Sequence, residues 1–324
     1  METRRRFLIA SALGALSVRY AAAQGRQAKV GMLSARSLAE SVYAGGVVRR
    51  LAELGYRQGA GMALEFRHAN GFAERYAPLA RELIDLKCDI IFAIGPELPV
   101  RALQDARSPM PIVFLAVDYD PLEKAIVASL RKPDRNTTGV YVPSNELAAK
   151  RVEIMREVVP AARRFLALSD VFSRDQLNAA RKAAERRGVR LIVVDFPNQP
   201  YDFDSAFAAG AKEQAEAFIT MSSPVFATHA AVLSALALKH RLPSIGTVVP
   251  QVNVGFLMSF AAHPGKTTAR AADIGVRILK GAKPSDIPVE QADEFELAVN
   301  AKTARALGVK IPESVLARAT RVVQ

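Results

Sequence analysis

Residues 76–95, YAPLARELIDLKCDIIFAIG, place an amphipathic helix directly before a buried strand, and this pairing decides the fold. The helix has one apolar stripe, because its apolar side chains recur at i, i+3, i+4, i+7 and i+8. They are Tyr76, Leu79, Ala80, Leu83 and Ile84. The run CDIIFAIG at 88–95 is short and aliphatic, which is typical of a strand covered on both faces. The segment therefore predicts a helix that packs on a parallel sheet.

The same alternation extends in both directions from this segment. Four further aliphatic runs are predicted as strands, at 30–34, 62–68, 111–117 and 137–142. After Pro143 a second series begins, with a helix at 144–159, strands RFLALSD (164–170), RLIVVDF (190–196) and AFITMSS (217–223), and helices around 180, after 196 and up to His240. Alternating strands and helices form right-handed units with helices on both faces of a parallel sheet. Two series of similar length predict an α/β protein with two doubly wound lobes.

Two pieces remain after the second series. One is the strand GFLMSF (255–260) with a helix at 267–280, and the other is EFELAVN (294–300) with a terminal helix. Each is too small to form a domain, so we expect each to join one of the two lobes.

The N-terminus combines arginines with an apolar run from Phe7 to Val18. A membrane anchor, a basic arm for nucleic acid and a removable export signal would each explain it. The run is shorter than the roughly 20 residues that a membrane span needs, and small residues follow it at Ala21 and Ala23. Residues 1–23 are therefore predicted to be a signal peptide, cleaved near Ala23. Thr3 to Leu8 resembles the twin-arginine pattern, which implies export after folding. No Cys follows the small residues to carry a lipid anchor, so we expect a soluble mature protein in the periplasm.

The chain has a formal net charge of +12, which raises the question of nucleic acid binding. Its Lys and Arg residues are scattered along polar helix faces, as in Arg181, Arg186 and Arg187, and no helix-turn-helix or aromatic-basic motif accompanies them. We therefore expect these Lys and Arg residues to lie on the solvent-exposed surface, and we expect no nucleic acid partner. The single cysteine, Cys88, cannot form an internal disulfide and is predicted to be a small core residue.

Candidate ligand contacts follow the strands, because ligands of open parallel sheets bind beyond the carboxyl ends of the strands. The first series offers Ser34, Arg36, Gly95, Glu97, Asp118, Tyr119 and Tyr141, and the second offers Asp170, Phe172, Asp195, Phe196, Ser222, Ser223 and Thr247. Carboxylates bind amines, helix starts bind carboxylates and aromatic rings pack a side chain, so the set suits a small zwitterion. Helix capping is an equal alternative for the Ser and Asp residues, and Asp120 before Pro121 is predicted to be a cap.

Sequence signals for an enzyme are absent. Gly265-Lys266-Thr267 resembles the end of a P-loop, but Phe260 stands where that motif needs its first glycine. The chain has no GxGxxG, GxSxG or HExxH motif, and its four histidines lack the spacing of metal ligands. Paired carboxylates for acid–base catalysis cannot be identified without distances. We expect no catalytic residue, no metal site and no cofactor, and an enzyme remains an open but unsupported alternative.

Several segments resemble the ABC transporter substrate-binding family related to tryptophan and tyrosine uptake proteins. They are LAELGY (51–56), ARELIDLKCDIIFAIG (80–95), PIVFLAVDYDPLEKAIVASL (111–130), MSSPVFATH (221–229), LKHRLPSIG (238–246) and residues 279–319. The resemblance implies a type I periplasmic binding protein, with two lobes joined by a three-segment hinge that closes on a ligand. It assigns 28–141 plus 255–286 to the N-terminal lobe and 142–254 plus 287–324 to the C-terminal lobe. Glu97 stands where many relatives have a small or hydroxyl residue, and a carboxylate pointing into the cleft would repel an amino-acid carboxylate.

The function implied by this resemblance is capture of a small molecule for a membrane permease. The expected partners are the small-molecule ligand and an ABC permease in the inner membrane with its separate ATPase, and we expect the binding protein to be monomeric. A sensory module that reports the ligand to a membrane partner would use the same fold and site. A hydrolase or transferase acting in the cleft is the remaining alternative.

Overall fold

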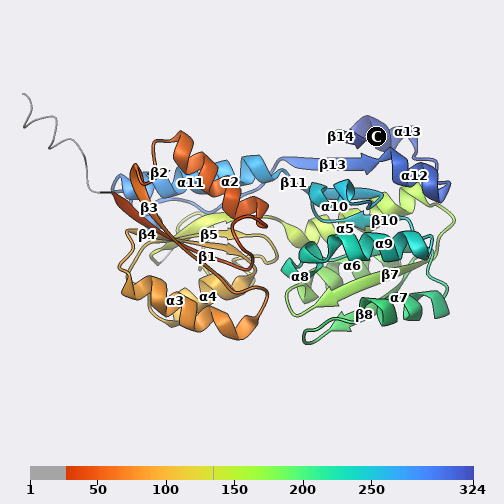
Figure 1. Cartoon of the computed structure of the whole chain (residues 1–324), viewed down its shortest axis with the longest axis horizontal. Coiled ribbons are helices and arrows are strands. Elements are labelled where there is room, and N and C mark those ends of the chain that lie inside the picture. The colour runs from red at the N-terminus through yellow and green to blue at the C-terminus, as the bar shows by residue number, and fades with distance from the viewer. Residues whose placement is uncertain (1–26, 134) are drawn as a thin grey trace, which may run out of the picture.

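Each of the two lobes is built on a seven-stranded sheet, and the lobes lie side by side (Figure 1). The computed structural model describes residues 27–133 and 135–324, so the predicted signal peptide at 1–23 lies outside the described residues. The α/β class with two doubly wound lobes is confirmed. No helix of the described part of the chain is long and apolar enough to cross a membrane.

The N-terminal sheet has the order β12-β6-β5-β4-β1-β3-β2, and its paired strands all run parallel. Its strands are β1 (Ala28–Ser34), β2 (Arg57–Gln58), β3 (Gly61–His68), β4 (Ile90–Gly95), β5 (Ile112–Ala116), β6 (Thr137–Tyr141) and β12 (Glu290–Gln291). One face packs on α2 (Val42–Glu53) and α11 (Pro264–Leu279), and the other on α3 (Tyr76–Asp85) and α4 (Glu97–Asp105). Adjacent residues of β1 alternate between the two cores, Met32 facing α2 and α11 and Leu33 facing α3 and α4.

The C-terminal sheet has the order β14-β13-β11-β10-β9-β7-β8. Its strands are β7 (Arg164–Asp170), β8 (Arg190–Phe196), β9 (Ala217–Thr220), β10 (Ser244–Gly246), β11 (Met258–Ala262), β13 (Phe295–Asn300) and β14 (Arg321–Val323). Its helices are α5 (Ser144–Val158), α6 (Arg174–Arg186), α7 (Phe203–Lys212), α8 (Pro224–Thr228), α9 (Ala230–Lys239), α10 (Val249–Asn253), α12 (Ala301–Leu307) and α13 (Glu313–Arg318). Two helical turns remain. The turn η1 (Ala73–Arg75) lies directly before α3, and the turn η2 (Pro284–Asp286) lies between α11 and β12.

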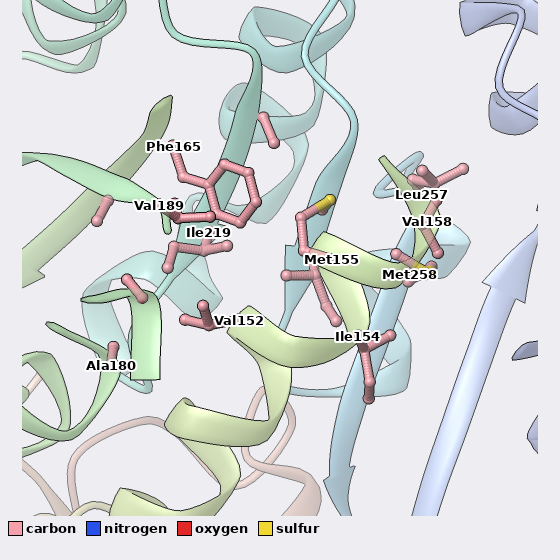
Figure 2. Packing of buried hydrophobic residues seen from close by; sticks show 14 of the residues in the cluster. Val152, Ile154, Met155, Val158, Phe165, Ala180, Val189, Ile219, Leu257 and Met258 are labelled. Atoms are coloured by element: carbon pink, nitrogen blue, oxygen red, sulfur yellow. The ribbon is translucent and has the colours of Figure 1, made fainter. Parts of the chain in front are cut away.

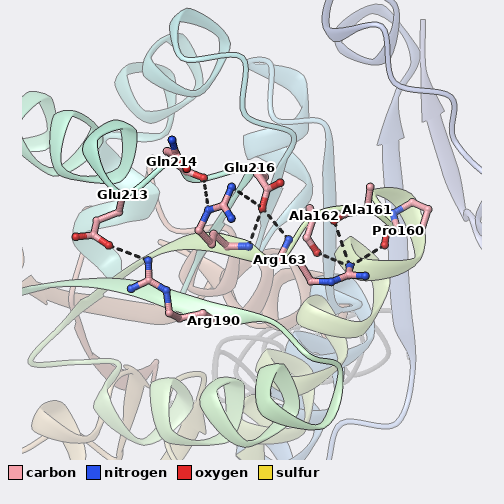
Figure 3. A network of polar contacts seen from close by, with 9 residues as sticks. Pro160, Ala161, Ala162, Arg163, Arg190, Glu213, Gln214 and Glu216 are labelled. Atoms are coloured by element: carbon pink, nitrogen blue, oxygen red, sulfur yellow. Dashed lines mark hydrogen bonds and ion pairs between the residues drawn. The ribbon is translucent and has the colours of Figure 1, made fainter.

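The largest apolar cluster of the C-terminal lobe lies between α5, α6 and one face of the sheet. Figure 2 shows Val152 and Met155 of α5 near Phe165 and Ile219 of the sheet. The amino ends of β7 and β9 are held together at the edge of this cluster by Glu216, which accepts from the backbone N–H groups of Arg163 and Arg164 at 2.8 and 3.0 Å (Figure 3). The lobe is thus fixed at the end of the sheet opposite the cleft.

Three crossovers connect the lobes and are hydrogen-bonded to one another. The Ala292 N–H donates to the Tyr141 carbonyl at 2.8 Å, and the His263 N–H donates to the Glu294 carbonyl at 2.8 Å. Val142, Leu147, Ala262 and Ala292 pack together at the same place. The chain therefore passes between the lobes at one narrow junction, as a hinge requires.

Two of the predicted lobe boundaries are wrong. The strand predicted at 255–260 to return to the N-terminal lobe is β11, which pairs with β10 and β13 in the C-terminal sheet, and α11 alone makes the return. Residues 290–291, predicted in the C-terminal lobe, form β12 and pair with β6 of the N-terminal sheet. Because β11 leaves the C-terminal lobe and β13 enters it from the same junction, the two strands are antiparallel.

Candidate functional site

A cavity of about 320 Å³ lies between the lobes at the carboxyl ends of their strands. The N-terminal lobe contributes the segment from the end of β1 to the start of α2, the end of β4 and the end of β5. The C-terminal lobe contributes the residues after β9 and after β10. Both sheets reverse their strand order nearby, at β1 and at β7, so their connecting loops diverge and leave a crevice.

Half of the residues predicted from the strand ends line this cavity. They are Ser34, Arg36, Gly95 and Asp118 from the N-terminal lobe and Ser222, Ser223 and Thr247 from the C-terminal lobe. They belong to segments far apart in the sequence, and the contact between the two lobes brings them together. Their chemistry combines one cation, one carboxylate and four hydroxyl groups.

Three predicted contacts in the N-terminal lobe lie away from the cavity. Glu97 begins α4 and is turned toward Arg101, whose Nη2 lies 2.6 Å from its Oε1. Tyr119 is buried in the core next to α3 and α4, because successive residues after β5 point to opposite sides and Asp118 takes the side of the cavity. Tyr141 lies in the same core, and its hydroxyl group donates to Gln291 Oε1 at 2.7 Å.

Three predicted contacts in the C-terminal lobe also lie away from the cavity. Asp195 and Phe196 end β8, which is the edge strand of its sheet and therefore far from the centre of the cleft. Asp195 pairs with Arg174 at 3.7 Å, and Phe196 stacks on Tyr201 with ring centroids 4.6 Å apart. Phe172 lies in the turn after β7, where its N–H donates to Asp170 Oδ1 at 3.1 Å.

Asp170 is fully buried behind the cavity wall and supports it. Its carboxylate accepts hydrogen bonds from the hydroxyl groups of Ser173, Tyr201 and Ser223. Ser223 in turn caps α8 by accepting from the Val225 N–H at 3.1 Å. Burial raises the pKa of Asp170 and these hydrogen bonds oppose the rise. Asp170 therefore fixes the Ser222–Ser223 turn and does not face a ligand in the cavity.

Asp118 is the predicted carboxylate residue that lines the cavity. The residue is 6% exposed, and its Oδ1 atom is buried without a hydrogen-bond partner among the described residues. Burial raises the pKa of Asp118 to about 7, and the negative charge of Asp170 adds to the rise. A hydrogen bond with the Ser222 side chain and the charge of Arg151 act in the opposite direction. An ammonium group of a ligand in the cavity would compensate the charge of this carboxylate.

The start of α2 offers a place for a negatively charged group of a ligand. Ser41 caps this helix by accepting from the Ala44 N–H at 3.1 Å, and Ser41, Val42 and Tyr43 line the cavity. Arg36 lies beside them, with its Nε atom buried and without a hydrogen-bond partner among the described residues. A helix start and a guanidinium group together favour a carboxylate.

Several residues that line the cavity were not predicted from the ends of the strands. Glu40 and Tyr43 lie in and just after the β1–α2 connection, and Gln251 lies in α10. The Gln251 Oε1 atom accepts from the N–H groups of Thr247 and Val248 at 2.6 and 3.2 Å and fixes the loop after β10. Ser41, the residue before α2, is a capping signal that sequence analysis could have detected for that connection, whereas Gln251 has no sequence signal of its own.

The two lobes touch each other outside the cavity. Lys124 Nζ pairs with Asp175 Oδ2 at 2.5 Å, and Gln199 Nε2 donates to the Gly71 carbonyl at 3.1 Å. A smaller cavity of about 160 Å³ adjoins the main one and includes Arg36, Glu40 and His229 in its wall. Among the described residues, no group of His, Cys, Asp and Glu side chains is arranged to hold a metal ion.

Comparison with known proteins gives a consistent result. A family model described as ABC transporter substrate binding protein matches residues 30–323. A tyrosine-binding protein of Clostridioides difficile is 23% identical over 269 residues, which cover 82% of this chain and 76% of that protein.

Solved structures share the fold. A conserved domain protein of Vibrio cholerae matches with a TM-score of 0.84 and 24% identity over 92% of this chain and 100% of its own. An ABC domain from Streptococcus pneumoniae in complex with L-Trp matches with a TM-score of 0.81, 24% identity and the same coverage.

Proposed function

Because this chain belongs to the ABC transporter substrate-binding protein family, we propose that it is an exported receptor for a small zwitterion of amino-acid size. In this proposal it captures the ligand between its lobes in the periplasm and delivers it to an inner-membrane permease driven by a separate ATPase. The basic and apolar N-terminal residues would direct export. Ligand binding alone is required of the chain, since the family is one of binding proteins.

The observation that carries the proposal is the Asp118 carboxylate, which belongs to a residue of the cavity wall and whose buried Oδ1 atom has no hydrogen-bond partner among the described residues. A buried charge needs a partner, because an uncompensated one opposes folding. A ligand ammonium group fits this requirement. The N-terminal end of α2 and Arg36 offer a separate place for a carboxylate on the same cavity. Two sites of opposite charge are the pattern that a zwitterion needs.

The size of the cavity supports a small ligand. About 320 Å³ lies at the lower end of the range of about 300–1,000 Å³ typical of small-molecule sites. The apolar part of the wall includes Val42, Val117 and Pro250, which would contact an apolar side chain. The relatives described as tyrosine-binding and as a complex with L-Trp make aromatic amino acids the first ligands to test.

Closure of the lobes is the proposed means of capture. Both lobes supply wall residues, so a ligand contacts the full set only when the lobes are together. Such a ligand shifts the population toward the closed form by the difference between its affinities for the closed and open forms.

The experiment is a thermal-shift panel with the purified protein and amino acids, aromatic acids, amides and nucleosides. A ligand at about 100 times its dissociation constant adds roughly 2.7 kcal/mol of stability, which raises the melting temperature by several degrees. We expect stabilisation by one or a few amino acids, and recovery of the bound ligand unchanged by mass spectrometry. Stabilisation by nucleosides alone, or conversion of the ligand, would contradict the proposal.

A further inference from the structure

Arg151 carries a positive charge into the junction between the lobes. It lies in the middle of α5 and is 2% exposed. Its Nη1 atom donates to the Phe260 carbonyl at 3.1 Å, but its Nε and Nη2 atoms are buried and have no hydrogen-bond partner in the part of the chain that the structure describes. A buried guanidinium group is costly for the fold unless it serves another group.

A second, small cavity separates Arg151 from the ligand cavity. Its volume is about 10 Å³, and it shares wall residues Tyr43, Val117, Ser222 and Thr247 with the main cavity. This volume is about what one water molecule needs, so a ligand carboxylate does not enter it. Arg151 thus lies one layer behind the wall of the ligand cavity and can act on a ligand only through a residue of that wall.

Asp118 is the charged residue of the wall next to this small cavity, because it follows Val117 and is hydrogen-bonded to the Ser222 side chain, and Val117 and Ser222 line both cavities. Asp118 and Arg151 each stabilise the charged form of the other: the charge of Arg151 lowers the pKa of Asp118, and the charge of Asp118 raises the pKa of Arg151. Burial lowers the pKa of Arg151 to about 10, so the guanidinium group is still protonated at neutral pH. Asp118 lines the ligand cavity, and its buried Oδ1 atom has no hydrogen-bond partner among the described residues.

We propose that Arg151 is a positioning residue for ligand recognition, whose buried charge favours the carboxylate form of Asp118 so that the cavity selects an ammonium ligand over a neutral ligand of the same shape. The inference rests on the proposed function and deepens it, since it names the charge that the ligand carries and the residue that enforces this selection.

Groups from several elements surround Asp118 and set its charge. Those that interact with it are Tyr43 on α2, Tyr76 on α3, the adjacent Tyr119, Arg151 on α5, Asp170 at the end of β7 and Ser222 after β9. Arg36 and Glu40 also line the cavity and interact with each other. Of the charged groups that act on Asp118, Asp170 favours the neutral carboxyl and Arg151 favours the carboxylate. Removing the charge of Arg151 should therefore raise the pKa of Asp118.

The first test needs no ligand. The carboxyl carbon of Asp118, assigned by comparison with Asp118→Asn in protein labelled with ¹³C-aspartate, is titrated by NMR in the original protein, Arg151→Met and Arg151→Lys. We expect the midpoint in Arg151→Met to rise by about one pH unit, and Arg151→Lys to stay near the original value. An unchanged midpoint in Arg151→Met would overturn the inference while leaving the proposed function intact.

The second test measures selection. Dissociation constants of L-tyrosine and L-tryptophan are compared with those of their 2-hydroxy acid analogues by calorimetry between pH 5 and pH 9. In Arg151→Met, the pH at which amino-acid binding strengthens should move upward. The preference for the amino acid over the hydroxy acid at pH 7 should fall about fivefold, because the ionised fraction of Asp118 falls from about one half to about one tenth.

The outcomes of this second test are separable. If Arg151 had only a structural role, Arg151→Met would lower the affinity for both classes of ligand equally at every pH. That result would overturn the inference and leave the proposed function intact. If the original protein preferred the hydroxy acids, or bound neither class, the zwitterion proposal and the inference would both fail.

Discussion

Lys124 Nζ lies 2.5 Å from Asp175 Oδ2, and this ion pair joins the N-terminal lobe to the C-terminal lobe. Lys124 belongs to the loop after β5, and Asp175 lies in the first turn of α6. The Lys124 carbonyl also accepts from Arg101 Nη2 at 2.6 Å, and Arg101 is held in turn by Glu97. Glu97, which was expected to contact the ligand, thus supports a contact that holds the lobes together.

Lys124→Ala should favour the open form of the protein. The two side chains are 32% and 39% exposed, so the pair contributes about 0.2–1 kcal/mol to closure. We expect ligand affinity to fall by at most about fivefold. The radius of gyration of the ligand-free variant, measured by small-angle X-ray scattering, should be larger than that of the original protein at low salt. The difference should shrink at high salt, which screens the ion pair.

The matched control for this variant is Arg318→Ala. Arg318 pairs with Glu157 at 2.5 Å with similar exposure, but both residues belong to the C-terminal lobe. Its loss should leave the radius of gyration and the ligand affinity unchanged. An equal effect of both variants would mean that general surface charge controls closure, and that the Lys124–Asp175 contact has no special part in it.

Asp118→Asn should weaken binding of an ammonium ligand by at least about 30-fold, because it removes one member of a buried charge pair. The measurement is calorimetric titration at pH 8, where Asp118 is mostly ionised. Asp195→Asn is the control, since Asp195 lies on edge strand β8 and pairs with Arg174 at 3.7 Å. Equal affinity in the two variants would remove Asp118 from the site.

The same substitution should change how the stability of the empty protein depends on pH. The pKa of Asp118 is about 7 in the folded protein against an ordinary value of 3.8. Below about pH 4 the carboxyl is protonated in both the folded and the unfolded state, and it has no effect. Between about pH 4 and pH 7 the unfolded state loses the proton first, so stability falls as pH rises, and above pH 7 the full penalty applies.

Asp118→Asn removes this penalty. In urea unfolding without ligand, the variant and the original protein should be equally stable near pH 4, and the variant should be more stable by up to a few kcal/mol near pH 8.5. A stability difference that is the same at both pH values would show that folding does not raise the pKa of Asp118.

The fold could be predicted from sequence because hydrophobic periodicity is a local property. The strands β7 and β8 begin and end where their aliphatic runs do. The assignment of β11 to the wrong lobe has a different origin. A strand with a given pattern fits either sheet, and the choice depends on pairing with β10 and β13, which are separated from it along the chain.

The candidate site was predictable only near the centre of each sheet. Asp118 and Ser222 follow strands β5 and β9 and face the cavity. Asp195 follows a similar run, but β8 is an edge strand, which sequence does not reveal. Arg151 was not identified because a lone cation in a predicted helix is usually exposed. Its burial follows from the packing of α5 against the crossovers, which no local pattern encodes.

Gly246→Ala should weaken binding of all ligands without changing its pH dependence. A Cβ atom at this position would lie 2.3 Å from Gln251 Oε1 and 2.9 Å from its Cδ, so the Gln251 side chain would have to move. Its hydrogen bonds to the N–H groups of Thr247 and Val248 would be lost, and the loop after β10 would no longer be held against the cavity. We expect similar losses of affinity for an amino acid and its hydroxy acid analogue between pH 5 and pH 9, in contrast to Arg151→Met.

Gly45→Ala provides the control for this last variant. Gly45 lies in α2 near the same cavity, and a Cβ atom there would make only ordinary contacts, the nearest at 3.6 Å to Arg49 Nη1 and the Leu38 carbonyl. Alanine is favoured over glycine inside a helix by up to about 1 kcal/mol. The control should therefore be slightly more stable and bind its ligand normally. If Gly246→Ala also bound normally, Gln251 would have a second conformation that still holds the loop, and its present hydrogen bonds would not be required for the site.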